Sequence, residues 1–189
     1  MRRATVNDRQ LVIDILKKSF DDNKSVNYVV KQDQKRKDRI QGLMEYSFDV
    51  CNAFGEVWMS EDLQASALIL FPDKKTTSLK TILWDLKLAL SVIGVDRVGA
   101  VLRRESMIKR QHPKEPFAYL WFIGVNPSKQ NTGIGSGFIK EVIHKCEKEE
   151  RPIYLETSVE RNLPFYKKFG FEIFQSLNLS YKLYQLRRV

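Results

Sequence analysis

The stretch "FAYLWFIGVNPSKQNTGIGSGFIKEVI", residues 117–143, decides the fold of this chain. It begins with an apolar run typical of a buried strand, and it ends in an amphipathic helix. The loop between them holds four of the nine glycines of the chain. Glycine costs conformational entropy in an ordered segment, so this cluster indicates either a tight turn or a group that must approach the backbone closely. A strand, a glycine-rich loop and a helix can together aim N–H groups and a helix dipole at a phosphate.

The spacing of the glycines decides which of the known phosphate-binding loops this sequence can form. A P-loop requires Lys and then Ser or Thr after its last glycine, and no Lys follows the glycines here. Gly133, Gly135 and Gly137 give Gly-x-Gly-x-Gly instead of the dinucleotide fingerprint Gly-x-Gly-x-x-Gly, and no βαβ pair with a terminal acid follows. Both of these loops are excluded. Gln130, Gly133 and Gly135 fit a third arrangement, Gln-x-x-Gly-x-Gly.

The rest of the chain alternates between helical and extended patterns. Helical spacing covers 6–20 and 33–50, and it returns between 78 and 110 with a break at Gly94. Strands are predicted within 55–60, 64–72, 117–125 and 152–158, and the last two, 171–176 and 179–186, close the chain. A short helix is predicted over 161–170, ended by Gly170. The sequence therefore predicts a mixed α and β fold.

Composition predicts a soluble globular protein of one domain, residues 1–189, because 43% of the residues are apolar and 29% are charged. No secretory signal is visible, and the apolar runs are shorter than the ~20 residues that span a bilayer. Two distant cysteines favour a reduced, cytoplasmic protein. The net charge of +9 indicates either an anionic partner or a solvated basic surface. Because Lys and Arg are spread along the chain, nucleic acid is not expected as a partner. No membrane partner is expected either, because the apolar runs are too short to span a bilayer.

The loop, with Val125 and Pro127 before it, resembles the acetyl-CoA loop of the GNAT superfamily of N-acetyltransferases. "LETS" (155–158) and "RNLPFYKKFGF" (161–171) resemble the second half of that core. From "HPKEP" (112–116) to Phe171 the chain is most similar to the puromycin N-acetyltransferase-like members. The resemblance implies a mostly antiparallel sheet of about seven strands, splayed between the fourth and fifth and flanked by helices. It also implies a helical insertion, about 74–112, between the third and fourth strands.

Acetyl-CoA as co-substrate, with no metal, follows from the same resemblance. Its pantetheine arm would pair with the strand at Ile123, Gly124 and Val125. Its pyrophosphate would rest on the loop, that is, on Gln130, Asn131, Thr132, Gly133, Ile134, Gly135 and Ser136. Asn131 stands where the family usually has Gly, and Asn tolerates positive φ better than other side chains. The hydroxyl of Thr132 could reach a phosphate, and Lys129 could replace a missing basic residue.

Tyr166 is the predicted catalytic acid, because a phenol can protonate a departing thiolate; a purely structural tyrosine is the alternative. Glu156 could be the base, could steer the acceptor ammonium, or could form a salt bridge to a nearby Lys or Arg. Asn162 would contact the pantetheine arm or cap its helix. His112 is expected to be a loop or helix-end residue rather than a base, and His144 a solvated surface residue. No residue spacing suggests a metal site or a nucleophile, so direct attack in a ternary complex is expected.

The insertion is expected to form a helical cover packed on the core, with a lid, a wall of the acceptor site or a dimer contact as alternatives. Its apolar residues are Trp84, Leu86, Leu88, Leu90 and Ile93. The predicted function is acetyl transfer to a primary amine of a small molecule, in a monomer or homodimer. The alternatives are acetylation of a protein or ribosome-associated amine, and a non-catalytic acyl-CoA binding module.

Overall fold

The computed structural model describes all residues 1–189, and its centre is one seven-stranded sheet with the strand order β1-β2-β3-β4-β5-β7-β6. Every neighbouring pair is antiparallel except β4 and β5, which are parallel. The strands are β1 (Arg2–Arg3), β2 (Gly55–Met59), β3 (Ala65–Leu70), β4 (Ala118–Val125), β5 (Ile153–Thr157), β6 (Glu172–Asn178) and β7 (Lys182–Arg188). The predicted fold class is therefore confirmed.

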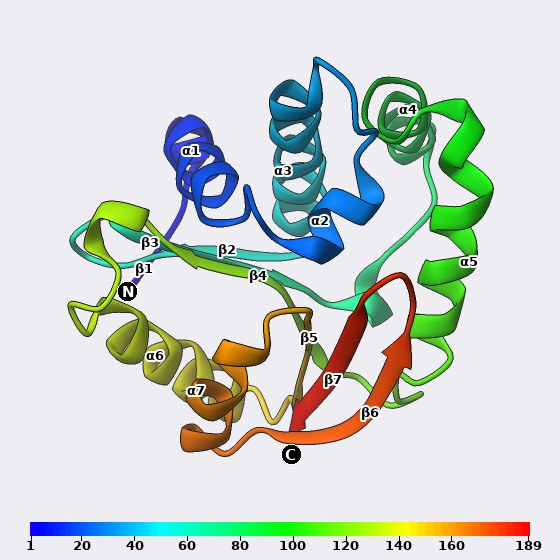
Figure 1. Ribbon diagram of the computed structural model, residues 1–189. Coiled ribbons are helices and arrows are strands. Elements are labelled where there is room, and N and C mark those ends of the chain that lie inside the picture. The colour runs from blue at the N-terminus through cyan, green and yellow to red at the C-terminus, as the bar shows by residue number, and fades with distance from the viewer.

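Helices cover both faces of the sheet (Figure 1). One face carries α1 (Arg9–Ser19), α2 (Lys24–Val29) and α3 (Arg36–Phe54), and the other carries α6 (Ile134–Lys148) and α7 (Leu163–Lys168). Between β3 and β4 the chain forms α4 (Leu79–Leu88), a π-helical turn (Ala89–Ile93) and α5 (Val98–Lys109). Of these elements, β1 and α2 had no prediction, because segments of two and six residues are too short to show a hydrophobic period.

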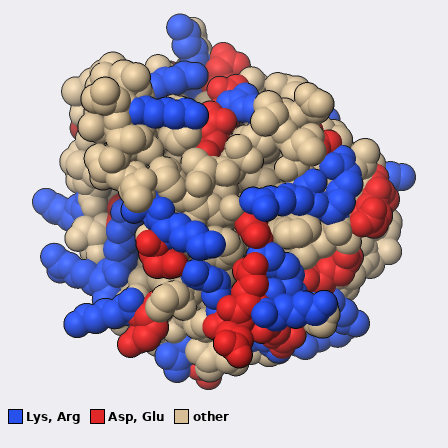
Figure 2. Space-filling view, turned by 180° about the vertical axis from the view of Figure 1, so that it is seen from behind, with Lys and Arg blue, Asp and Glu red and all other residues tan.

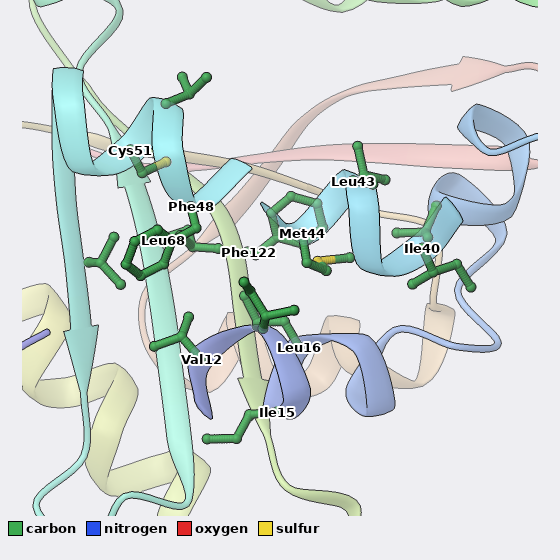
Figure 3. Close-up of a cluster of buried hydrophobic side chains, with 14 of the residues drawn as sticks. Val12, Ile15, Leu16, Ile40, Leu43, Met44, Phe48, Cys51, Leu68 and Phe122 are labelled. Atoms are coloured by element: carbon green, nitrogen blue, oxygen red, sulfur yellow. The ribbon is translucent and has the colours of Figure 1, made fainter. Parts of the chain in front are cut away.

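Two hydrophobic clusters, one on each face, hold these layers together. Figure 3 shows the first, where Val12, Ile15 and Leu16 of α1 lie beside the buried side chains of α3 and the sheet. The second contains the apolar stripe of α6, in which Phe138, Ile139, Val142, Ile143 and Cys146 are all buried as their helical spacing predicts. The two clusters anchor the loop before α6 against a rigid sheet.

The sheet opens between β4 and β5. Only Ala118 and Tyr119 of β4 pair with β5, opposite Ile153 and Tyr154, and the two strands then diverge. A bulge at Trp121 interrupts the pairing of β4 with β3, because Phe122 and Leu120 face consecutive residues of β3. Beyond Tyr119 the edge of β4 that faces β5 therefore has no strand partner, as the predicted splay requires.

The insertion departs from the expected core cover. Ile93 is buried, and Trp84 and Leu88 are partly buried against the first cluster. Leu86 and Leu90, however, are 52% and 55% exposed. The physical reason is that α4 carries apolar residues on two opposite faces, while only one of these faces can lie against α3.

Candidate functional site

The loop before α6 presents an unbroken row of unused hydrogen-bond donors. The six main-chain N–H groups from Asn131 to Ser136 donate to no acceptor in the protein, and the first bond of this turn is Gly137 N–H to Gly133 O, at 3.0 Å. Asn131 (φ +63°) and Gly133 (φ +89°) adopt the left-handed conformation, as was expected of Asn131. Left-handed residues next to a helix start turn successive N–H groups toward one concavity, which also receives the positive end of the helix dipole. This concavity suits an anion.

The glycines of this loop are not required by protein packing. A Cβ added at Gly133 or Gly137 would meet nothing within 4 Å, and one at Gly135 would meet only Val125 Cγ2, at 3.4 Å. Gly133 is needed for its positive φ, and the space beside the other two is open. Gly124 differs, because its Cβ would lie 3.0 Å from Ser19. Gly124 is therefore explained by the packing of α1 on β4.

The alternation of the antiparallel ladder decides which groups of β4 are free. Asn126 N–H donates to Gln64 O at 2.8 Å, so two residues earlier Gly124 also directs its main-chain groups toward β3. Gly124 thus has no free main-chain group for a pantetheine arm. Ile123 and Val125 point to the open edge, and the hydroxyl of Ser19, which lies 2.8 Å from Ile15 O, also lies 2.7 Å from the carbonyl of Val125 and competes for it. Both groups of Ile123 and the N–H of Val125 remain.

Two side chains of the loop behave differently from expectation. The hydroxyl of Thr132 donates to Lys129 O at 2.7 Å, so its proton is already used within the loop. Lys129 itself is exposed, and its ammonium forms no salt bridge. Of the two, Lys129 is the side chain free to meet an anion.

Tyr166 lies in α7 with its ring in the second cluster. The ring packs edge-on against Phe165 and Phe171, with centroids 5.5 and 5.6 Å away, and the residue is 8% exposed. Its hydroxyl has no hydrogen-bond partner in the protein, and burial raises the pKa of Tyr166 to about 12. The hydroxyl oxygen is not among the enclosed side-chain atoms that lack a partner, so it keeps some access to solvent and can meet a ligand atom. α7 ends before Gly170 (φ +80°), as predicted.

Asn162 stands at the N-terminus of α7, but it does not cap the helix. Its side chain makes no capping hydrogen bond, and its backbone is already helical (φ −85°, ψ −13°). The capping alternative is therefore wrong, and the amide of Asn162 is left half-buried without a protein partner.

Glu156 points from β5 into a polar cluster on the opposite side of the sheet from α6. His112 Nε2 lies 3.1 Å from Glu156 Oε1, and the hydroxyl of Tyr119 donates to Oε2. Gln185 Nε2 approaches Oε1 at 3.5 Å. Because Tyr119 is on β4, its bond to Glu156 crosses the point where the two strands separate. The partners of this carboxylate are thus His112, Tyr119 and Gln185, and the alternative of a salt bridge to Lys or Arg is not formed.

Sequence reasoning undervalued His112 and missed Tyr119 and Gln185. His112 does follow the end of α5, as expected, but its ring packs between Phe117 and Tyr119, with centroids 5.1 and 5.2 Å away. The three partners lie 44, 37 and 29 residues from Glu156, so only the fold brings them together. His144, in contrast, is exposed on α6 as predicted.

The electrostatics of the cluster favour a cationic ligand. Burial, and then the charge of Glu156, hold the pKa of Tyr119 well above its usual value. Gln185 is fully buried, and its Oε1 has no hydrogen-bond partner. A carboxylate, a phenol oxygen and an unpaired amide oxygen therefore share one small region, and all three can accept a proton or an N–H group.

Arg104 ties three elements together beside this cluster. It is 7% exposed, and its Nε donates to the hydroxyl of Tyr181 at 2.8 Å while another nitrogen donates to Ser25 Oγ. A cavity of about 260 Å³ lies against it, lined by Tyr28, Gly99, Ala100, Arg103, Met107 and Leu179. Another cavity, of about 660 Å³, lies elsewhere, between α3 and α4.

Comparisons with known proteins agree with this geometry. A family model described as the acetyltransferase (GNAT) family matches residues 78–171, about half of the chain. An uncharacterized N-acetyltransferase of Schizosaccharomyces pombe is 39% identical over 62 residues, which cover 33% of this chain and 25% of that relative. The chain thus matches only about a quarter of the length of its curated relative.

Solved structures share the whole fold at low identity. A histone acetyltransferase HPA2 and related acetyltransferase from Corynebacterium glutamicum has a TM-score of 0.73 at 18% identity, covering 99% of this chain and 93% of that one. The C-terminal condensation domain of Ebony, in complex with beta-alanyl-dopamine, has a TM-score of 0.72 at 10% identity, covering 99% and 96%. Arylalkylamine N-acetyltransferase 2 from Aedes aegypti has a TM-score of 0.64 at 12% identity, covering 98% and 95%.

The splayed sheet and the donor-rich loop at the start of α6 define an acetyltransferase fold. With the family match, they place the chain in the GNAT superfamily of acetyltransferases. No helix of the structure is long and apolar enough to cross a membrane.

Proposed function

We propose that the protein is an acetyl-CoA-dependent N-acetyltransferase that moves an acetyl group to a primary amine by direct attack in a ternary complex. The observation that carries this proposal is the row of six unused N–H groups, Asn131 to Ser136, beside an unpaired strand edge. The row would hold the pyrophosphate of the co-substrate. Ile123 and the N–H of Val125 would pair with its pantetheine amides. Residues 1–189 then form one acetyltransferase domain, with about 74–112 as its insertion.

Tyr166 would donate a proton, or a hydrogen bond, to the departing sulfur. With its pKa raised to about 12, it is a weaker acid than an exposed phenol. The same apolar surroundings also disfavour a charged thiolate and so raise the proton affinity of the sulfur. The pKa values of the phenol donor and of the sulfur acceptor are thus both raised, and proton transfer between them stays possible. Asn162, half-buried and without a protein partner, would contact the pantetheine arm.

The acceptor must lose a proton before it attacks, since an alkylammonium has a pKa of about 10 and cannot act as a nucleophile. Glu156 is the proposed acceptor of that proton. Tyr119 and His112 hold its two oxygens, and His112, which is only partly buried, connects the carboxylate toward solvent. The unpaired Oε1 of Gln185 would take an N–H of the amine.

A small-molecule acceptor is the proposed substrate class. Arg104 links α5 to Ser25 of α2 and to Tyr181 in the β6–β7 turn, and Ser25 N–H also donates to Ser158 Oγ at 3.3 Å. These bonds tie three elements together beside Glu156, and a confined space of this kind suits a small amine better than a long polypeptide. The similarity of residues 112–171 to puromycin N-acetyltransferase-like members supports the same class. A cytoplasmic location stays a prediction.

A coenzyme A release assay tests the activity. Acetyl-CoA would be supplied with a panel of aminonucleosides, arylalkylamines, aminoglycosides, polyamines, N-terminal peptides and basic ribosomal proteins. Turnover with at least one small amine is expected. Turnover with peptides or ribosomal proteins alone would contradict the substrate class. Silence throughout, despite measurable coenzyme A binding, would leave a non-catalytic binding module.

A matched pair of glycine variants tests the loop. Gly135→Ala places a methyl group in the open space beside the N–H row, and we expect coenzyme A affinity in calorimetry to fall at least about tenfold, because phosphate oxygens lose contact with the backbone. Gly99→Ala in α5 is the control, since its Cβ meets nothing within 4 Å and Gly99 lies outside the loop. Equal affinity in both variants would contradict the proposed cradle.

A further inference from the structure

The exposed face of α4 is an apolar surface with no partner in the structure. Leu79, Ile82, Leu83, Leu86 and Leu90 are between 51% and 82% exposed. They recur at intervals of three and four residues, so they form one stripe along the helix and the π-helical turn, named here the α4 face. The opposite side, with Thr81, Trp84 and Leu88, is at least partly buried. Figure 2 shows an uncharged area on the side of the molecule where α4 lies.

This stripe is unlike the scattered apolar residues of an ordinary surface. Single exposed leucines are normal, but a contiguous exposed patch marks an interaction site. Seven of the eleven large exposed apolar side chains lie in the insertion, which adds Val95 and Leu102 to the α4 face. The insertion therefore concentrates exposed apolar surface in one region, whereas the rest of the molecule exposes few large apolar side chains.

Basic side chains border the α4 face. At about 100° per residue, Lys80 and Lys87 lie along one edge of the stripe. Both are exposed, and the ammonium of Lys87 also lies 3.9 Å from Glu45 Oε2 of α3. On the other side, Asp85 accepts the hydroxyl of Tyr46 at 2.7 Å and is thereby drawn toward α3. Residues 72–115 contain ten Lys or Arg against five Asp or Glu, within a chain of net charge +9. The charge around the apolar stripe is thus suited to an anionic partner.

These features together favour one occupant. A second copy crossing antiparallel along the stripe would bring Lys80 and Lys87 of the two copies together, and like charges disfavour that pairing. Nucleic acid would satisfy the lysines but would leave the leucines in water. An anionic phospholipid surface satisfies both, because the leucines enter the acyl boundary while the lysines meet the headgroups.

We propose that the α4 face docks the protein peripherally on anionic lipid bilayers. The helix would lie in the plane of the interface, with Leu83 and Leu86 buried and Lys80 and Lys87 at headgroup level. Trp84 lies on the opposite, partly buried side of the helix, and the ammonium of Lys80 lies 5.0 Å from its ring centroid. Peripheral binding needs no spanning segment, so the earlier expectation of no membrane partner, which rested on the short apolar runs, does not bear on it. The proposal is also independent of the acetyl-transfer chemistry.

Vesicle co-sedimentation tests the proposal. The protein is expected to bind vesicles of phosphatidylcholine with phosphatidylserine, to bind phosphatidylcholine alone weakly, and to lose binding as salt is raised. Leu83→Ser with Leu86→Ser should weaken binding at least about tenfold, from the apolar area lost. Lys80→Ala with Lys87→Ala should weaken it about fivefold for each lysine.

The control is Val6→Ser, which removes an equally exposed apolar residue, 70% exposed, at the start of the chain. It should bind as the unmodified protein does. Absence of binding to anionic vesicles, equal binding to neutral ones, or the same affinity in the Leu83/Leu86 variant and the control would each overturn the proposal. So would a concentration-dependent dimer in sedimentation that the Leu83/Leu86 variant abolishes, because the α4 face would then be a contact between copies.

Discussion

At the scale of single residues, Tyr166 is the sharpest test of the chemistry. Tyr166→Phe keeps the ring in its cluster and removes only the hydroxyl, which has no partner in the protein. We expect turnover to fall by ~10²-fold or more while coenzyme A binding stays unchanged. Steady-state kinetics and calorimetry measure the two effects. An unchanged turnover number would assign the hydroxyl a structural role.

The pH dependence of the same residue can also be predicted. Burial raises the pKa of Tyr166 to about 12, so the group stays protonated, and able to donate, at every ordinary assay pH. Ionisation of Tyr166 should therefore cause no loss of kcat below about pH 10. The pH profiles of kcat for the unmodified protein and for Tyr166→Phe should have the same shape in that range. A basic limb near pH 8 that this substitution removes would mean that the phenol ionises much more easily in the complex.

Glu156 gives a second prediction at this scale. If it takes the proton of the acceptor ammonium, Glu156→Gln should lower kcat/KM about 10²-fold near pH 7. The defect should shrink as the pH approaches the pKa of the amine, because the free amine then needs no base. His112→Gln, which removes a partner 3.1 Å from the carboxylate, should show a smaller loss of the same kind. A loss in Glu156→Gln that is independent of pH would instead indicate a role in holding the acceptor.

At the scale of elements, the junction of α3 with β2 depends on one glycine. A Cβ at Gly55 would lie 2.0 Å from Ile69 O and 2.9 Å from Leu70 Cα, and neither backbone atom can move without disturbing β3. Gly55→Ala should lower the free energy of unfolding by about 3 kcal/mol or more. Gly99→Ala in α5 should raise it by up to about 1 kcal/mol. Denaturant unfolding measures both, and similar stabilities would contradict the close approach of these strands.

How well an element can be predicted from the sequence depends on whether the residues that determine it are neighbours in the chain. The apolar stripe of α6 and the loop before it are adjacent in the sequence, so Gln130, Gly133 and Gly135 could be recognised as parts of one loop motif from their spacing alone. The same holds for Gly170, whose positive φ ends α7. The reverse holds for α4: its periodicity predicted a helix, but periodicity does not say which apolar face lies against α3 and which remains in water.

At the scale of the whole molecule, buried phenols and thiols predict a loss of stability in alkali. Burial raises the pKa of Tyr166 and of the Cys146 thiol to about 12, and it raises the pKa of Tyr119 and of Cys51 as well. A raised folded pKa means that the stabilisation is fully present below the unfolded pKa, near 9 to 10, and is lost as the pH rises toward 12. Denaturant unfolding should show a constant free energy up to about pH 8 and a steep decline above it.

The contribution of one group to this decline can be isolated. A rise of about two pKa units for buried Tyr166 corresponds to a loss on the order of 3 kcal/mol across this range. Tyr166→Phe has no ionisable phenol, so its stability should decline less between pH 9 and 11 than that of the unmodified protein. Parallel declines in the two proteins would mean that this phenol does not resist ionisation in the fold.

The sequence by itself determined the class of the protein, because that depends on local order. A strand, a glycine-rich loop and a helix are followed by "LETS" and "RNLPFYKKFGF", and the period, the end and the glycine-rich turn of these elements are each set within a few residues. The tertiary structure alone decided the partners of Glu156, the contact of Ser19 with the carbonyl of Val125 and the exposure of the α4 face. Each of these is a contact, or a missing contact, between segments far apart in the chain, and hydrophobic period and spacing carry no information about such pairs.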